Sequence, residues 1–287
     1  MKTKANWFDV LNVIVIFLFI LIIFIPFWYI FVISTSTYPV YIRDQYHLIP
    51  KSFTLAEYQR AFVKSKDMML SLWVSIKVTF TGTVISMILT TIGGYALSKN
   101  TLPGRNIIFR LILLTMFFSG GLAPSYILIK SLNMSNTIWA LTIPGAVGTY
   151  YLILMKNYFL SSVNQSLEEA AKIDGCNDIQ ILYKIVLPIS VPVIAAISLF
   201  YGVGYWNDYL SATLYSSSPN LMPFQIYLRN LIIVNVAAQK AGVDTGISAY
   251  AQFKMAVIII GIIPIVLVYP FVQKHFTKGT ILGAVKE

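Results

Sequence analysis

Six stretches of the chain lack Asp, Glu, Lys and Arg over roughly the 20 residues that a helix needs to cross a bilayer. They are Leu11–Ile33, Val78–Leu97, Leu111–Ile129, Ile138–Met155, Ile185–Asn207 and Met255–Gln273. In lipid the backbone must satisfy its own hydrogen bonds, so each stretch is predicted to be helical. The pattern indicates an all-α integral membrane protein with six transmembrane helices.

The composition supports a lipid environment. Hydrophobic residues make up 57% of the 287 residues and charged residues only 11%, whereas soluble domains carry about 25% charged residues. The net charge of +10 comes from basic residues between the apolar stretches, where they suit anionic lipid headgroups. No basic stripe with interleaved aromatics indicates nucleic-acid binding, and the lone Cys176 excludes an intrachain disulfide.

Glycine and proline recur inside the apolar stretches. The groups are Gly93 and Gly94; Gly120, Gly121 and Pro124; Pro144, Gly145 and Gly148; Gly202 and Gly204; and Gly261 and Pro264. Small residues let membrane helices pack closely, whereas kinks at such residues form hinges around a transport pathway. The sequence leaves both interpretations open.

The connections between the stretches predict the orientation of the chain. The connection Ser98–Arg110 holds three basic residues and no acidic one, whereas Lys130–Thr137 holds only Lys130. By the positive-inside rule, this difference places both termini in the cytoplasm. We expect a first transmembrane helix with an external segment in residues 1–70, a transmembrane core in 71–277 and a cytoplasmic tail in 278–287.

The most informative connection is the loop 156–188, which separates two apolar stretches. Ser166 followed by Glu169 predicts a capping box at a helix start, and Asn177 followed by Gln180 predicts a second. Gly175 lies between them, where a left-handed residue would end the first helix cheaply. We therefore expect two short helices joined by a tight turn, which is either a rigid docking element or an ordinary amphipathic loop on the membrane surface.

Fixed positions within this loop resemble a known signature. Glu169-Ala170-Ala171, then Gly175, then Ile185-Val186-Leu187-Pro188 resemble the EAA motif of ABC importer permeases, in which this loop enters a groove on the ATP-binding subunit. The resemblance implies the type I importer permease fold, with a cytoplasmic coupling-helix loop at 156–188. The residues expected to couple to the ATPase are Glu169, Ala170, Ala171, Asp174, Gly175, Leu187 and Pro188.

Two further matches narrow the resemblance. The segment 204–209, GYWNDY, is similar to the fifth-span motif of sugar permeases, and the tail 278–286 is similar to that of the second permease of a heterodimer. The resemblance implies one half of the translocation pathway for a carbohydrate, with an oligosaccharide as the expected substrate, in the bacterial cytoplasmic membrane. The implied partners are a second homologous permease, two ATP-binding subunits and an extracytoplasmic solute-binding protein. No cofactor or metal is expected in this chain, because ATP and magnesium would lie on the partner subunits.

Aromatic and polar residues gather at the outer end of the fifth stretch. They are Tyr201, Tyr205, Trp206, Asn207 and Asp208. Aromatic rings with neighbouring polar groups suit the apolar faces and hydroxyl rims of sugars, so these residues are candidates for the substrate pathway. The alternative is an interfacial belt, since tyrosine and tryptophan gather at membrane surfaces in any case.

Motifs of other function classes are missing from the sequence. It contains no Gly-x-x-x-x-Gly-Lys-Ser/Thr, no His-Glu-x-x-His and no Gly-x-Ser-x-Gly, so the chain is not expected to be an enzyme. A secondary carrier is an alternative, although the apolar stretches lack the ionisable residues that proton-driven carriers use. A membrane-embedded polysaccharide-processing enzyme is another, but it would need converging acid, base or metal groups.

Overall fold

The computed structural model describes residues 7–44, 46–240 and 247–284. Every regular element within these ranges is helical, in agreement with the predicted fold class. By length and composition, three stretches can each cross a membrane as one helix: α1 (Trp7–Thr35), α4 (Lys66–Ser98) and Ala251–Pro270 within α15 (Ile247–Ala284). They contain or overlap the first, second and sixth predicted stretches.

The chain forms two compact units, of which the first comprises residues 1–69 and 227–264. It contains α1, α2 (Tyr38–Arg43), α3 (Ala56–Gln59), the π-helical turn η1 (Arg60–Lys64) and most of α14 (Phe224–Lys240). Ser36 Oγ lies 2.8 Å from His47 Nε2, and the side-chain amide of Gln252 donates to the Ser36 carbonyl. The guanidinium of Arg60 lies 5.1 Å from the ring centre of Phe253. These contacts hold the segment after α1 against the start of α15.

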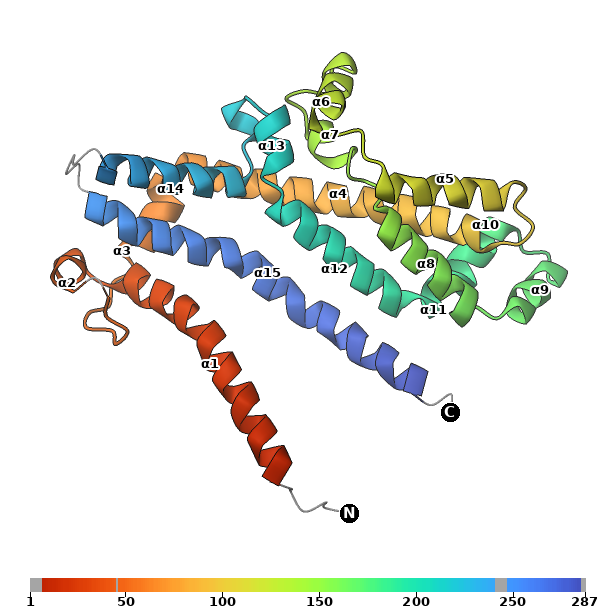
Figure 1. The fold of residues 1–287 in the computed structure, drawn as a ribbon, viewed down its shortest axis with the longest axis horizontal. Helices are drawn as coiled ribbons and strands as arrows, with labels where there is room; N and C mark the ends of the chain where they lie inside the picture. The colour runs from red at the N-terminus through yellow and green to blue at the C-terminus, as the bar shows by residue number, and fades with distance from the viewer. Residues whose placement is uncertain (1–6, 45, 241–246, 285–287) are drawn as a thin grey trace. The chain divides into compact units, whose positions relative to one another are not determined.

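The second unit comprises residues 70–226 and 265–287. Its elements in chain order are α4, α5 (Arg105–Phe117), α6 (Leu122–Ser131), α7 (Ile138–Thr142), α8 (Thr149–Ser162), α9 (Gln165–Ile173), α10 (Asp178–Ile181), the π-helical turn η2 (Leu182–Val186), α11 (Leu187–Ile189), α12 (Val191–Asn207), α13 (Leu210–Tyr215) and the 3₁₀ turn η3 (Pro219–Leu221), followed by the end of α15. Figure 1 shows α9 beyond one end of α12 and α13 at the other end.

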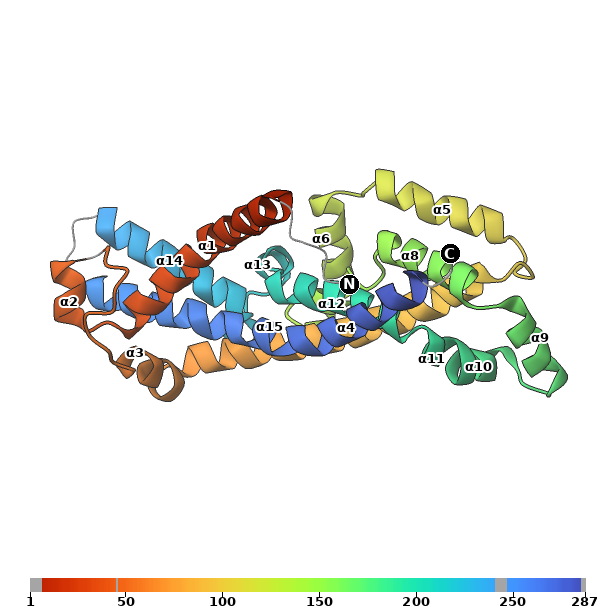
Figure 2. The ribbon, with the colours of Figure 1, turned by 90° about the horizontal axis from the view of Figure 1, so that it is seen from below.

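Two hydrophobic clusters hold the second unit together. One joins α4, α8, α12 and the loop helices through buried side chains that include Tyr95, Met155, Ala171 and Ile197. The other joins α4 to α6, α7 and α13. The first cluster places α9 and α10 at the end of α4 (Figure 2).

Three of the six predicted stretches are not single helices. The α5–α6 pair bends by 116° where Gly121 takes a positive φ of 80°. Residues 143–148, which include Pro144, separate α7 from α8 and are not helical. A bend of 84° precedes α12, because Pro192 has no N–H to donate to the carbonyl of Pro188. Gly121 and Pro144 therefore lie at breaks in the helices, and a role of these breaks as hinges around a pathway stays a prediction.

Close packing explains the glycines of α4. A Cβ atom on Gly94 would lie 2.9 Å from Met155 Cγ, and one on Gly93 would lie 3.0 Å from Leu152 Cδ1. Both distances are shorter than ordinary van der Waals contact, so the two glycines allow α8 to approach α4. Glycine thus permits close packing at α4 and a break between α5 and α6 within the same unit.

Candidate functional site

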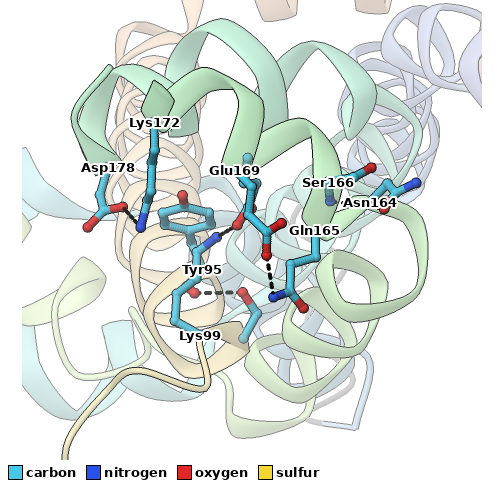
Figure 3. Close-up of polar contacts among 10 residues, drawn as sticks. Tyr95, Lys99, Asn164, Gln165, Ser166, Glu169, Lys172 and Asp178 are labelled. Carbon is cyan, nitrogen blue, oxygen red and sulfur yellow. Dashed lines mark hydrogen bonds and ion pairs between the residues drawn. The ribbon is translucent and has the colours of Figure 1, made fainter. Parts of the chain in front are cut away.

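Helix α9 begins one residue before Ser166. The side chain of Asn164 accepts a 3.1 Å hydrogen bond from the backbone N–H of Ser166, and Glu169 accepts one of 2.8 Å from the amide of Gln165 (Figure 3). The predicted capping box between Ser166 and Glu169 is therefore wrong. Asparagine and serine are similarly good N-caps, and capping by Asn164 leaves Ser166 inside the first turn.

A left-handed glycine ends α9, as predicted. Gly175 has a φ of 83°, its N–H donates to the Lys172 carbonyl at 3.0 Å, and the N–H of Cys176 donates to the Ala171 carbonyl at 2.9 Å. This pair of bonds is the Schellman arrangement, which satisfies carbonyls at the helix end. The loop turns sharply here without leaving those backbone groups unpaired.

The predicted capping box at Asn177 is present. The backbone N–H of Gln180 donates to Asn177 Oδ1 at 2.9 Å, and the backbone N–H of Asn177 donates to Gln180 Oε1 at 3.0 Å. Across the turn, Lys172 Nζ lies 3.1 Å from a carboxylate oxygen of Asp178 (Figure 3). The two short helices expected from the sequence are therefore formed, and each has its own cap.

An ion pair and a buried alanine attach the loop to the membrane helices. Lys99, directly after α4, pairs with Glu168 of α9, and its ammonium lies 4.1 Å from the ring centre of Tyr95 (Figure 3). Ala171 is buried against the cluster that contains Tyr95. No spacing in the sequence predicts the Lys99–Glu168 pair, because its two residues lie far apart in the chain.

The tip of the loop is exposed and partly apolar. The exposed fraction is 87% for Ile173 and 73% for Ile179, and Ala170, Asp174 and Gly175 are also exposed. The tip therefore presents two isoleucine side chains away from the packed core. Neither isoleucine belongs to the fixed positions of the EAA motif, so the motif does not predict their exposure.

The last two predicted coupling residues lie where the loop returns to the membrane helices. Leu187 is half-buried and Pro188 is exposed, and both line an apolar groove of about 620 Å³ beside Met87 and Val191. They contribute to the bend before α12 rather than to the exposed tip. Whether they contact an ATPase stays a prediction.

Tyr201 and Tyr205 point from α12 toward α4 and the break between α7 and α8. The hydroxyl of Tyr201 lies 2.8 Å from Thr90 Oγ1 and accepts from the backbone N–H of Gly148 at 2.9 Å. The hydroxyl of Tyr205 lies 2.9 Å from Ser86 Oγ and donates to the Thr142 carbonyl at 2.9 Å. Both tyrosines thus satisfy backbone groups that the broken helix leaves unpaired.

The other three candidate pathway residues differ in exposure. Trp206 is buried and stacks on Phe224 with ring centres 6.5 Å apart. Asn207 is exposed and donates to the Val203 carbonyl at 3.0 Å. Asp208 accepts from the backbone N–H of Ser211 at 3.1 Å, at the start of α13. The structure therefore brings Tyr201 and Tyr205 together and directs Trp206 elsewhere, and a role in the substrate pathway stays a prediction for all of them.

Comparisons with known proteins agree with this architecture. Residues 103–281 match the family described as "Binding-protein-dependent transport system inner membrane component". The chain is 43% identical to the polygalacturonan/rhamnogalacturonan transport system permease protein YtcP of Bacillus subtilis over 99% of both chains. It is 39% identical to protein LplC of the same species, over 99% of this chain and 97% of the relative.

A solved structure shares both the fold and part of the sequence. It is the crystal structure of a bacterial ABC transporter involved in the import of the acidic polysaccharide alginate, with a TM-score of 0.86 and 32% identity over 96% of this chain and 99% of the other. The family match spans more than half of the chain, including the loop with the two short helices. The chain therefore belongs to the family of binding-protein-dependent transport system inner membrane components, the permease subunits of ABC importers.

Proposed function

We propose that the chain forms half of the translocation pathway for an oligosaccharide and couples it to partner ATPases through the loop 156–188. The observation that carries this proposal is the structure of that loop: a capped helix pair with an exposed apolar tip, attached to α4 by the Lys99–Glu168 ion pair. A pair of short helices closed by its own hydrogen bonds transmits a displacement, whereas a flexible loop of the same length would absorb it.

The coupling would proceed as a movement of the loop with its membrane helices. ATP binding drives transport only if it favours one conformation of the complex over another. Closure of the ATPases would displace α9 and α10 together, and the ion pair and the buried Ala171 would carry this displacement to α4 and α12. Coupling residues in this scheme are Glu169, Ala170, Ala171, Asp174 and Gly175 at the tip, with Leu187 and Pro188 at the return.

The names of the relatives support a carbohydrate as the substrate. One relative is named for polygalacturonan and rhamnogalacturonan transport, and the solved neighbour for the import of alginate. These polymers carry carboxylate groups, so we propose an acidic oligosaccharide. The complex would contain a second homologous permease, two ATP-binding subunits and an extracytoplasmic solute-binding protein, with the termini and the loop 156–188 in the cytoplasm.

Reconstitution of the purified complex in proteoliposomes tests the proposal. We expect uptake of oligogalacturonate that requires both ATP and the solute-binding protein. Uptake driven by an ion gradient without nucleotide would instead identify a secondary carrier. Transport by this chain purified alone would contradict the half-pathway.

A further inference from the structure

A polar hollow lies at the end of α12 away from the coupling loop. Its walls come from the end of α6, the connection to α7, and α13 with the residues after it, and its volume is about 430 Å³. Figure 1 shows α13 beside α6 and α7, at the opposite end of α12 from α9. This volume lies in the range of about 300–1,000 Å³ that small-molecule sites occupy. Under the topology proposed above, the hollow faces the outside.

The walls of the hollow are fixed by hydrogen bonds that join the two segments. Asn136 donates through its backbone N–H to the Tyr215 carbonyl at 2.9 Å, and its Oδ1 accepts from the backbone N–H groups of Ser217 at 2.7 Å and Ser218 at 3.1 Å. Asn133 and Asn136 have positive φ angles of 54° and 58°, which asparagine tolerates better than most residues. The hollow is therefore preformed, and this reduces the entropy lost on binding.

The lining combines one positive charge with hydroxyl, amide and aromatic groups. Lys130 is exposed at the rim, and no Asp or Glu is among the described residues that line the hollow. Lys130 forms no ion pair within the described part of the chain. Tyr126 and Tyr215 stack with their ring centres 6.2 Å apart and give the hollow an aromatic wall. An ammonium group, polar side chains and a flat apolar wall together suit a sugar that carries a carboxylate.

We propose that this hollow is an outer subsite that binds a uronate unit of the substrate, with Lys130 pairing with its carboxylate and Tyr126, backed by the buried Tyr215, contacting the sugar ring. The inference rests on the proposed import of an acidic oligosaccharide and adds a site for it. The subsite would hold one end of the sugar as it enters from outside. It is distinct from the coupling loop and from the tyrosines of α12.

Cysteine protection tests the subsite separately from transport. The experiment uses proteoliposomes that hold the two permeases and the two ATP-binding subunits, without the solute-binding protein. Cys176 is replaced by Ser, and Ser135→Cys places a thiol on the wall of the hollow. A membrane-impermeant maleimide is added outside with trigalacturonate or with its uncharged methyl ester. We expect trigalacturonate to slow the labelling and the ester to leave its rate unchanged. Lys130→Gln should raise the concentration of trigalacturonate that protects by about tenfold, the effect of losing one charge-assisted hydrogen bond.

Matched controls separate the outcomes. Lys64→Cys, an exposed position outside the hollow, should be labelled at the same rate with or without sugar, and Lys64→Gln should leave protection of Ser135→Cys unchanged. Absence of protection by trigalacturonate would overturn the subsite, as would equal protection by the ester. Protection by trigalacturonate that appears only when the solute-binding protein is added would overturn it in favour of a protein contact. Because labelling needs no ATP, a complex that protects but does not transport would support the subsite and contradict the proposed function.

Discussion

The phenolic oxygen of Tyr201 accepts a 2.9 Å hydrogen bond from the backbone N–H of Gly148. This bond connects α12 to the first residue before α8, on the far side of the break after α7. An N–H at such a break has no carbonyl one turn earlier to bond, and in lipid no water replaces it. A side chain thus completes the backbone of a neighbouring segment.

Tyr201→Phe should destabilise the complex by about 1 kcal/mol, because it removes the hydrogen-bond partner of the half-buried Gly148 N–H. The measurement is the thermal unfolding midpoint of the purified complex in nanodiscs. Tyr150→Phe provides the matched control, since Tyr150 is 61% exposed. Equal midpoints for Tyr201→Phe and Tyr150→Phe would show that the bond contributes nothing to stability.

Gly175→Leu should uncouple ATP hydrolysis from sugar uptake. The φ of 83° at Gly175 is unfavourable for leucine by about 1 kcal/mol or more, so the turn after α9 would shift. Gly175→Asn should behave nearly like the original chain, because asparagine tolerates this conformation. The ratio of sugar transported to ATP hydrolysed in proteoliposomes is the measurement, and an unchanged ratio for leucine would exclude a role of the turn in coupling.

Lys99→Glu should reduce uptake and weaken the attachment of α9 to α4, because it replaces the ion pair with Glu168 by a repulsion. The free energy that holds α9 on α4 should fall by about 1–3 kcal/mol, since both side chains are largely shielded from solvent. Glu168→Lys alone should have a similar effect, and the double exchange should restore uptake. Failure of the exchange to restore any activity would show that the pair acts through something other than its mutual attraction.

Ile173→Asp should prevent the ATP-binding subunits from associating, because it places a charge on the exposed apolar tip that would be buried in the complex. Ile173→Val keeps the tip apolar and should allow assembly. Co-purification of the subunits from membranes measures the outcome. If the aspartate variant retains its ATPases, the tip of the loop does not form the contact.

Local signals account for the parts of the structure that the sequence predicted. Gly175 and the Asn177–Gln180 capping box depend only on near neighbours, and the structure has both. The start of α9 differs from the prediction, because Asn164 and Ser166 are both acceptable caps and lie so close together that local preference does not choose between them.

Contacts between distant residues account for what the sequence could not predict. The hydrogen bonds of the Tyr201 hydroxyl to Thr90 and Gly148 join residues far apart in the sequence, so no local pattern predicts them. Pro144 predicts a break in the helix. Only the fold shows that α12 supplies the hydrogen-bond partners for the backbone groups at this break. Ile173 is likewise exposed because α9 turns the face that carries Ala171 toward the core.

The hydrogen bonds that close the helix pair α9–α10 begin and end within residues 164–182. Its backbone shape is thus encoded in a single short segment and does not depend on the sequences around it. Such a segment can be exchanged between permeases as a cassette, because the recipient needs to supply only a basic residue in the place of Lys99 and room for a small side chain at Ala171. Side chains at the tip, such as Ile173 and Ile179, are then free to diverge, and the choice of an ATPase can evolve without redesign of the transmembrane pathway.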